Sequence, residues 1–182
     1  MIYMFLAEGF EEIEAITPLD ILRRAGAEIQ TVSVNGNGLD VMGAHGILVR
    51  ADIEMKDVLA EEAEMIILPG GSKGTQGLKD SEALREIILS VNEREGYIAA
   101  ICAAPTVLGD MGLLNKRRAT CYPSLAGALI EKGAKYRTDK VVLDGHFITS
   151  EGAGTAADFG FALTDKLFSR SETDTLRLSM VY

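Results

Sequence analysis

The chain has 182 residues, a formal net charge of −9 at pH 7 and 47% hydrophobic residues. This length suits one domain with a substantial core, so we expect a single domain over residues 1–182. The acidic balance disfavours nucleic acid as a partner, because the main basic cluster is the short run Lys116-Arg117-Arg118. Two cysteines are too few for a disulfide scaffold, and they fit a reducing, cytoplasmic location.

The opening stretch, MIYMFLAEGFEE, predicts a first strand rather than a signal peptide. It has no basic region, and its apolar run stops at Ala7 before a series of acids. No apolar run in the chain approaches the length of about 18 residues that indicates a membrane helix. We therefore expect no membrane association.

Hydrophobic periodicity and turn residues predict an alternation of strands and helices along the chain. Strands are expected at 2–7, 29–34, 40–42, 47–50, 65–68, 97–101, 141–143 and 147–149, with a turn at Asn35-Gly36-Asn37-Gly38. Helices are expected at 11–25, 57–63, 81–95, 106–111, 125–132 and 155–168. Pro18 should bend the first helix or mark a late start, and the polar tail from Ser169 should lie on the surface or in a subunit contact. The alternation predicts an α/β fold: a three-layer α/β/α sandwich with a mainly parallel sheet.

Cys102 lies where a buried strand turns into a helix, with Pro105 in the first helical turn. A thiol at such a turn points toward the free N–H groups of the helix start, and the helix dipole favours its thiolate. The arrangement resembles a nucleophile elbow with Cys in place of Ser. The alternative is a small buried core cysteine, but a purely structural cysteine has no need of the turn.

Ligands of parallel α/β sheets bind beyond the carboxyl ends of the strands. Three loops follow strands at that edge, at residues 8–14, 69–72 and 102–105. The topology therefore places Glu14, Gly71 and Cys102 together.

Four segments, GFEEIEAITPLDILRRAG, IILPGG, AAICAAPTVL and ITSEGAGTAADF, occur in this order between residue 9 and about residue 160. With them the chain resembles the ThiJ/PfpI superfamily, in the DJ-one branch of the Parkinsonism-associated deglycase and its bacterial relatives. The resemblance implies a flavodoxin-like, class I glutamine-amidotransferase-like sandwich, a homodimer and no cofactor. It also implies that Cys102 is the reactive cysteine, that Glu14 is its hydrogen-bonding acid, and that Gly71 and Ala103 supply backbone N–H donors to an oxyanion pocket.

Two positions depart from the family pattern. A histidine usually precedes the proline that follows the elbow helix, and Tyr122 takes its place here. Tyr122 is a possible replacement as a hydrogen-bond partner, but a reference pKa of about 10 makes it a poor base at neutral pH. Protease-like relatives carry a histidine directly after the cysteine, so Ala103 disfavours a cysteine peptidase. Cys121 is either a resolving thiol or, as its surroundings favour, a buried neighbour.

The sequence gives the remaining candidate site residues less support for a chemical role. His45 and His146 have no metal-ligand partner at a useful sequence spacing, so no metal is expected, although the loop of His45 could approach the site. Gly152-Ala153-Gly154 indicates close packing between a helix and a strand rather than a phosphate site. A glutamine amidotransferase would need a downstream His-x-Glu pair, and the segment 148–152 has no histidine.

Two functions stay open. In one, the Cys102 thiolate attacks small reactive aldehydes such as methylglyoxal, in the manner of a glyoxalase or deglycase. In the other, the protein is a non-catalytic oxidative-stress sensor or redox-regulated chaperone, and an oxidant converts Cys102 to a sulfinic acid whose oxygens bond to Glu14.

Overall fold

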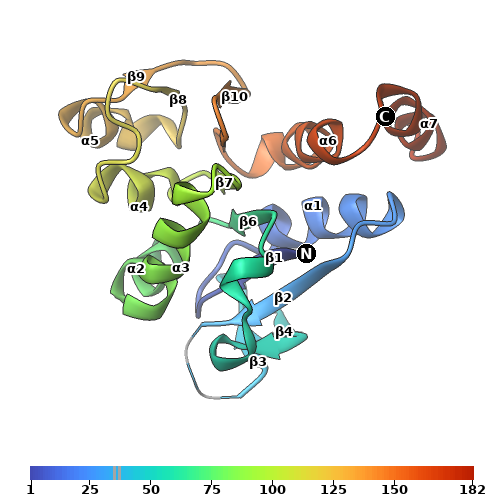
Figure 1. Ribbon diagram of the computed structural model, residues 1–182, viewed down its shortest axis with the longest axis horizontal. Coiled ribbons are helices and arrows are strands. Elements are labelled where there is room, and N and C mark those ends of the chain that lie inside the picture. The colour runs from blue at the N-terminus through green and yellow to red at the C-terminus, as the bar shows by residue number, and fades with distance from the viewer. Residues whose placement is uncertain (35, 37) are drawn as a thin grey trace.

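The computed structural model describes residues 1–34, 36 and 38–182 and is built around a seven-stranded sheet in the order β10-β11-β7-β6-β1-β2-β5 (Figure 1). Its strands are β1 (Ile2–Leu6), β2 (Ile29–Ser33), β5 (Ile53–Glu54), β6 (Met65–Leu68), β7 (Tyr97–Ile101), β10 (Val141–Asp144) and β11 (Phe147–Ser150). All neighbours are parallel except β10 and β11, which pair antiparallel. The predicted three-layer sandwich with a mainly parallel sheet is confirmed.

The alternation of side chains in β1 divides the core into two halves. Tyr3 and Phe5 belong to the apolar cluster on one face of the sheet, whereas Ile2, Met4 and Leu6 belong to the cluster on the other. Every residue of β1 is buried, because helices cover both faces of this central strand. The carboxyl ends of β1, β6 and β7 therefore open onto the same edge.

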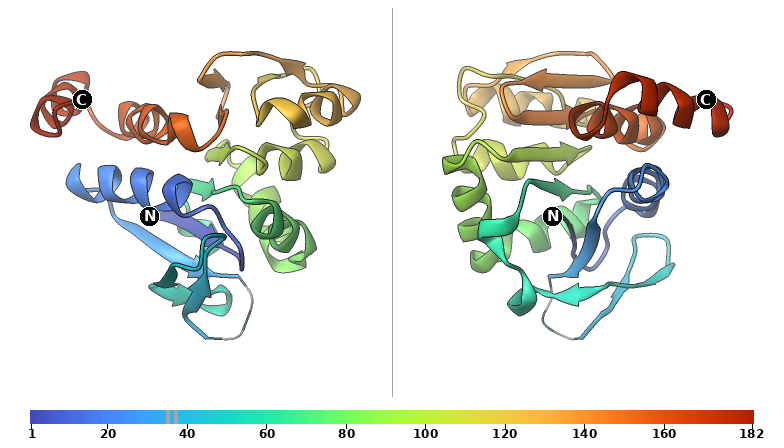
Figure 2. Two further views of the ribbon diagram at one scale, coloured as in Figure 1. Left: turned by 180° about the vertical axis from the view of Figure 1, so that it is seen from behind. Right: turned by 45° about the vertical axis from the view of Figure 1, so that its right-hand side comes forward.

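Two helical layers enclose the sheet. Helices α1 (Glu12–Arg24) and α6 (Ala156–Leu167) pack side by side on one face (Figure 2). The other face is covered by α2 (Ser72–Asp80), α3 (Glu82–Glu93), α4 (Pro105–Asp110) and α5 (Ala126–Glu131). The remaining elements are β3 (Asp40–Met42), β4 (Leu48–Arg50), β8 (Arg118–Ala119), β9 (Lys135–Tyr136), α7 (Arg170–Ser179) and 3₁₀ turns at 55–57, 60–62, 123–125 and 153–155.

The predicted strands and most predicted helices are confirmed to within one or two residues. The helix expected at 57–63 is wrong, because this segment forms two 3₁₀ turns separated by extended backbone at Val58. A late start of the first helix is also wrong: α1 begins at Glu12 and runs through Pro18. A Cβ at Gly160 of α6 would lie 3.0 Å from the Pro18 Cα, so the two helices lie very close together where α1 contains its proline. The turn expected at Asn35 and Asn37 lies outside the described residues.

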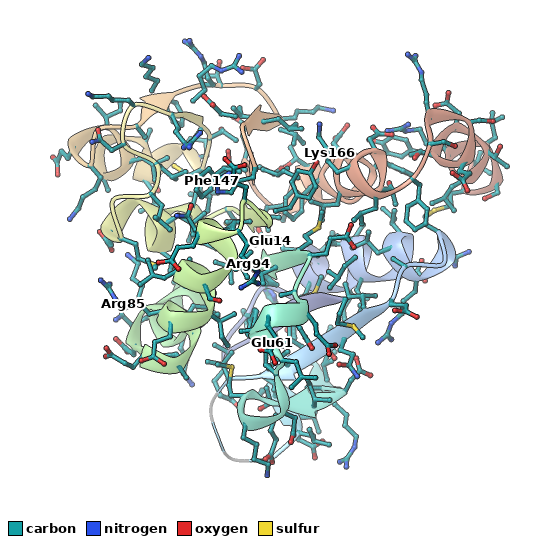
Figure 3. The ribbon with its side chains drawn as sticks, in the orientation of Figure 1. Glu14, Glu61, Arg85, Arg94, Phe147 and Lys166 are labelled. Atoms are coloured by element: carbon teal, nitrogen blue, oxygen red, sulfur yellow. The ribbon has the colours of Figure 1, made fainter. Side chains whose placement is uncertain are left out.

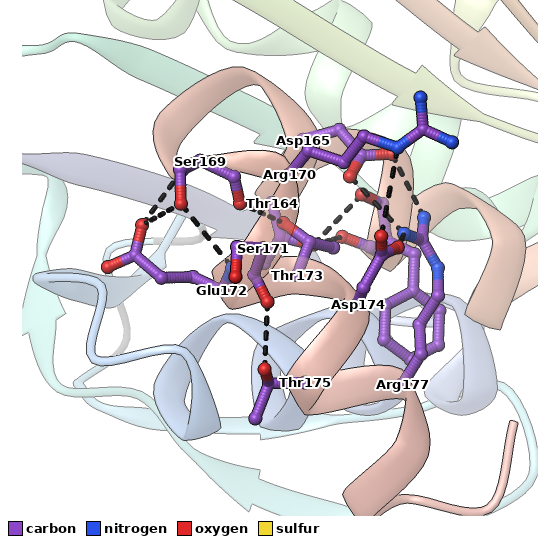
Figure 4. Close-up of polar contacts among 12 residues, drawn as sticks. Thr164, Asp165, Ser169, Arg170, Ser171, Glu172, Thr173, Asp174, Thr175 and Arg177 are labelled. Carbon is purple, nitrogen blue, oxygen red and sulfur yellow. Dashed lines mark hydrogen bonds and ion pairs between the residues drawn. The ribbon is translucent and has the colours of Figure 1, made fainter.

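Two helices were not predicted. Gly74 and Gly77 weaken the helical pattern of α2. A Cβ at Gly74 would lie 2.7 Å from the Phe10 Cα, so the close approach of α2 to the loop between β1 and α1 requires glycine. Helix α7 forms in the polar tail because Ser169 and Glu172 make a reciprocal capping box (Figure 4). No helix in the described part of the chain has the length and hydropathy needed to span a bilayer.

Candidate active site

Cys102 occupies a strained turn between β7 and α4. Its φ of +65° lies in the left-handed region that disfavours residues with a side chain. Two backbone hydrogen bonds hold this conformation: the Cys102 N–H donates to Ser150 O (2.9 Å), and the Tyr122 N–H donates to Cys102 O (2.8 Å). The predicted sharp turn is thus confirmed, and strain of this kind gathers at functional sites.

Glu14 approaches the cysteine from the first turn of α1. The side chain is buried, with 1% exposure, and lies near the middle of the molecule (Figure 3). Its Oε2 accepts a hydrogen bond from the Gly70 N–H at 3.0 Å. A Cβ at Gly70 would lie 2.5 Å from that oxygen and 2.7 Å from the Cys102 Cβ. Gly70 therefore packs against both the acid and the cysteine, and a side chain at this position would clash with both.

The electrostatics of the pair differ from the sequence-based expectation. Burial raises the pKa of Glu14 to about 7, against the opposing effect of hydrogen bonds with Cys102 and Gly70. Burial, with the Glu14 carboxylate beside it, raises the pKa of the Cys102 thiol to about 12. Desolvation and the neighbouring negative charge therefore oppose the thiolate that the sequence predicts, and outweigh the effect of the two N–H groups that favour it. The sulfur thus lies next to an acid whose pKa is raised to near neutrality.

Gly71 and Ala103 present backbone N–H groups to the Cys102 sulfur. Both N–H groups lower the pKa of the thiol, although less than burial raises it. Gly71 has a φ of +88° and precedes the first residue of α2, so this helix, which was not predicted, positions one of the donors. The four residues expected at the site, Glu14, Gly71, Cys102 and Ala103, are brought together around one sulfur. Gly70 was missed, although the glycine pair after Pro69 was the available signal.

Tyr122 borders the site, whereas its neighbour Cys121 does not. The Tyr122 side chain is half exposed, and a Cβ at Gly152 would lie 3.5 Å from its Cδ2 and 3.9 Å from the Cys102 Sγ. Cys121 is fully buried in the core and donates a weak hydrogen bond to Tyr122 O. Burial raises the pKa of Cys121 to about 11, with Glu151 contributing. Cys121 is thus the expected buried neighbour.

Neither histidine joins the cysteine. The His146 ring hydrogen-bonds Asn92 at 2.9 Å, and its carbonyl accepts from the N–H of Ile98 at the far end of β7. His45 Nδ1 lies 2.9 Å from Glu12 and 3.4 Å from Glu11. Sequence spacing offers His45 no such partner, but the turn between β3 and β4 folds back onto α1 and brings His45 to these two carboxylates.

The Glu11, Glu12 and His45 group has ligand atoms within 4.8 Å of one another, close enough to hold a cation. Glu12 is already satisfied, since its Oε1 accepts from the His45 N–H at 2.7 Å and its Oε2 contacts the His45 ring. Burial opposes ionisation of Glu12, but these hydrogen bonds lower its pKa overall. The group therefore forms a clamp between α1 and the β3–β4 turn. Glu11 and His45 of this clamp line a cavity of about 450 Å³ that also reaches Gly71.

A three-layer α/β sandwich with a strained cysteine elbow and a buried acid defines a class of nucleophile-elbow proteins. The model of the DJ-1/PfpI family matches residues 1–166, and the chain belongs to this family. It is 34% identical over 169 residues to protein dj-1beta of Drosophila melanogaster, covering 93% of this chain and 90% of that one. It is also 34% identical over 169 residues to the glutathione-independent glyoxalase DJR-1.2 of Caenorhabditis elegans, covering 93% and 89% of the two chains.

The fold agrees with solved structures of relatives. The oxidized DJ-1 of Toxoplasma gondii superposes with a TM-score of 0.93 at 31% sequence identity, covering 100% of this chain and 97% of that one. The superposition thus covers the whole length of this chain.

Proposed function

We propose that this protein converts small reactive aldehydes such as methylglyoxal, in the manner of a glyoxalase or deglycase, with Cys102 as the nucleophile. The observation that carries the proposal is the Cys102–Glu14 pair, in which an acid with a pKa of about 7 lies beside a thiol faced by two N–H donors. The name of the Caenorhabditis elegans relative, a glutathione-independent glyoxalase, supports the same chemistry. The reaction needs no cofactor.

Glu14 is the general base in this scheme. A catalytic base works best when its pKa lies near the operating pH, and burial gives Glu14 that property. As the sulfur bonds to the aldehyde carbon, Glu14 takes the thiol proton, so no preformed thiolate is required. The N–H groups of Gly71 and Ala103 stabilise the negative oxygen, which then receives the proton from Glu14 to give a hemithioacetal.

The hydrogen on the attacked carbon is moved next. Glu14 removes it as a proton and returns it to the neighbouring carbonyl carbon, while the hydroxyl proton passes to the oxygen of that carbonyl, so the first carbon is oxidised and the second reduced within one molecule. The product is a thioester of a 2-hydroxy acid. Water cleaves the thioester, releases the acid and restores the Cys102 thiol, and methylglyoxal plus water gives lactic acid without an external oxidant.

Tyr122 lines this site in place of the family's histidine. We assign it the role of a wall and hydrogen-bond partner, since a phenol is a poor base at neutral pH. A peptidase is less favoured, because Ala103 follows Cys102 where protease-like relatives have histidine.

The test is lactate formation from methylglyoxal by the purified protein, compared with Cys102→Ser and Glu14→Gln. The proposal expects both variants to lose at least about a hundredfold in kcat/KM, as removal of a nucleophile or a general base does. Cys121→Ser is the matched thiol control and should retain activity. Wild-type turnover no faster than that of Cys102→Ser would refute the proposal.

A second candidate function is a redox sensor or redox-regulated chaperone. The oxidized state of the Toxoplasma gondii relative favours it, as do the N–H groups and carboxyl that could bond sulfinate oxygens on Cys102. Mass spectrometry after mild peroxide should then show oxygen added selectively at Cys102. Equal oxidation of Cys121 and the methionines would rule this function out.

We further propose that the protein forms a homodimer and that it acts in the cytoplasm. Exposed apolar side chains gather on α1 and the β3–β4 hairpin, at Ile13, Ile16, Ile47 and Leu48, and such side chains are typical of subunit contacts. Both cysteines are free thiols, as a reducing compartment requires. Light scattering at micromolar concentration measures the mass directly, and a monomer there would contradict the dimer.

A further inference from the structure

Gly152 forms one wall of the Cys102 site. It follows β11 and is itself buried. A Cβ built there would lie 3.5 Å from Tyr122 Cδ2, 3.9 Å from Cys102 Sγ and 4.0 Å from Glu14 Oε1. The missing side chain thus leaves a space about the size of a methyl group, bounded by the aromatic ring, the thiol and the acid.

We propose that Gly152 is the specificity-determining residue of this site, and that the space beside it receives the group on the carbonyl carbon next to the one that Cys102 attacks, which is hydrogen in glyoxal and methyl in methylglyoxal. A methyl group fits this space in ordinary contact with its neighbours, and we expect larger substituents to be excluded. The identity of the substrates as aldehydes rests on the function proposed above, whereas the size limit rests on the geometry of Gly152.

The resting site would tolerate a methyl group at this position. All three distances are ordinary van der Waals contacts, and the φ of 165° at Gly152 is extended backbone that alanine also adopts. The site with an adduct would not tolerate it. A methyl substituent of the adduct that occupies this space would lie well inside the contact distance from that methyl group, whereas a hydrogen there would fit. Gly152→Ala should therefore spare the folded protein and impair only the occupied site.

Gly154 supplies a matched control two residues further on. It lies in the same 3₁₀ turn and is exposed, and a Cβ at Gly154 would meet nothing within 4 Å. Gly154→Ala therefore makes the same chemical change outside the site. Any effect shared by both variants comes from the backbone, and any effect confined to Gly152→Ala comes from the filled space.

The first measurement compares kcat/KM for glyoxal and methylglyoxal, which differ by one methyl group. A methyl group added in or removed from a snug pocket typically changes selectivity by about 10- to 200-fold. We expect Gly152→Ala to lower the ratio of methylglyoxal to glyoxal by about tenfold or more, and Gly154→Ala to leave it unchanged. Equal ratios in wild type and Gly152→Ala would overturn the proposal.

A second measurement does not depend on enzymatic activity. Intact-protein mass spectrometry follows alkylation of Cys102 by iodoacetamide and by 2-iodopropanamide, which carries one more methyl on the reacting carbon. The ratio of the two rates should fall about tenfold in Gly152→Ala and stay constant in Gly154→Ala. If wild type converts neither aldehyde, the proposed function is wrong and this ratio alone decides the role of Gly152.

Wild-type protein provides a further check if Gly152→Ala does not fold, as judged by thermal unfolding. Relative to free glutathione, Cys102 should react with 2-iodopropanamide but discriminate about tenfold or more against 2-iodobutanamide. Discrimination no greater than that of glutathione would refute the size limit.

Discussion

The raised pKa of Glu14 makes the stability of the protein depend on pH in a way that one substitution removes. The folded-state pKa is about 7, against an ordinary value of 4.5. The folded protein thus holds this proton more tightly than the unfolded chain does. The resulting stabilisation is fully present below pH 4.5 and is lost as the pH rises through 7. One pKa unit corresponds to about 1.36 kcal/mol. Raising the pH from 5 to 8 should therefore remove about 2 to 3 kcal/mol from the free energy of unfolding through this group.

Glu14→Gln removes the titration but keeps an oxygen that accepts from the Gly70 N–H. The free energy of unfolding, measured by urea denaturation, should therefore favour the variant over wild type by about 2 to 3 kcal/mol more at pH 8 than at pH 5. Comparing the two pH values cancels every effect that does not depend on pH. Glu61→Gln, at an exposed position, is the control and should show no such difference. A difference below about 1 kcal/mol for Glu14→Gln would refute the perturbed acid and, with it, the pKa match of the proposed base.

Three other changes test separate parts of the molecule. Gly70→Ala should destabilise the protein by about 1 to 3 kcal/mol through overpacking, as measured by urea denaturation. It should also abolish selective alkylation of Cys102, as measured by mass spectrometry. The hydrogen bond with Glu12 raises the pKa of His45, so the stability that His45 contributes is present below pH 6.5 and is lost as the pH rises through the raised value. The melting temperature of wild type should therefore exceed that of His45→Gln by more at pH 6 than at pH 8. A difference that is the same at both pH values would disprove the clamp. Ser169→Ala should cost about 1 kcal/mol in α7, seen as faster amide exchange confined to that helix, and unchanged exchange there would show that the cap is not needed.

The backbone of the site could be predicted from the sequence because it follows from topology. Cys102 and Glu14 lie just beyond the carboxyl ends of parallel strands, and such ends meet at one edge whatever the side chains are. The protonation state could not be predicted in the same way. It depends on how completely the sandwich buries both groups, which a local pattern of residues does not report. The thiolate expectation took account of the helix start and left out the larger effect of desolvation.

Glycines account for the other parts of the site that sequence reasoning missed. Gly70 and Gly152 act through the side chain that they lack, and the size of the space each one leaves depends on partners 30 or more residues away in the chain. Helix α2 was missed for a related reason: Gly74 lowers its intrinsic helix propensity but allows contact with the loop that precedes α1. For the site glycines and for α2 alike, a tertiary contact between distant segments, and not the local sequence, explains why glycine is needed.

The two candidate functions require opposite protonation states of the same acid. Attack on an aldehyde needs ionised Glu14 to accept the thiol proton, so kcat/KM should rise with pH through about 7 and then level off. Stabilisation of a sulfinate needs protonated Glu14 to donate a hydrogen bond, because two adjacent negative charges repel. Oxidation should therefore raise the melting temperature more at pH 6 than at pH 8 if the site is a sensor. Two results together would favour the sensor over the enzyme. The aldehyde-converting activity would fall with rising pH, and the stability added by oxidation would persist at low pH and disappear at high pH.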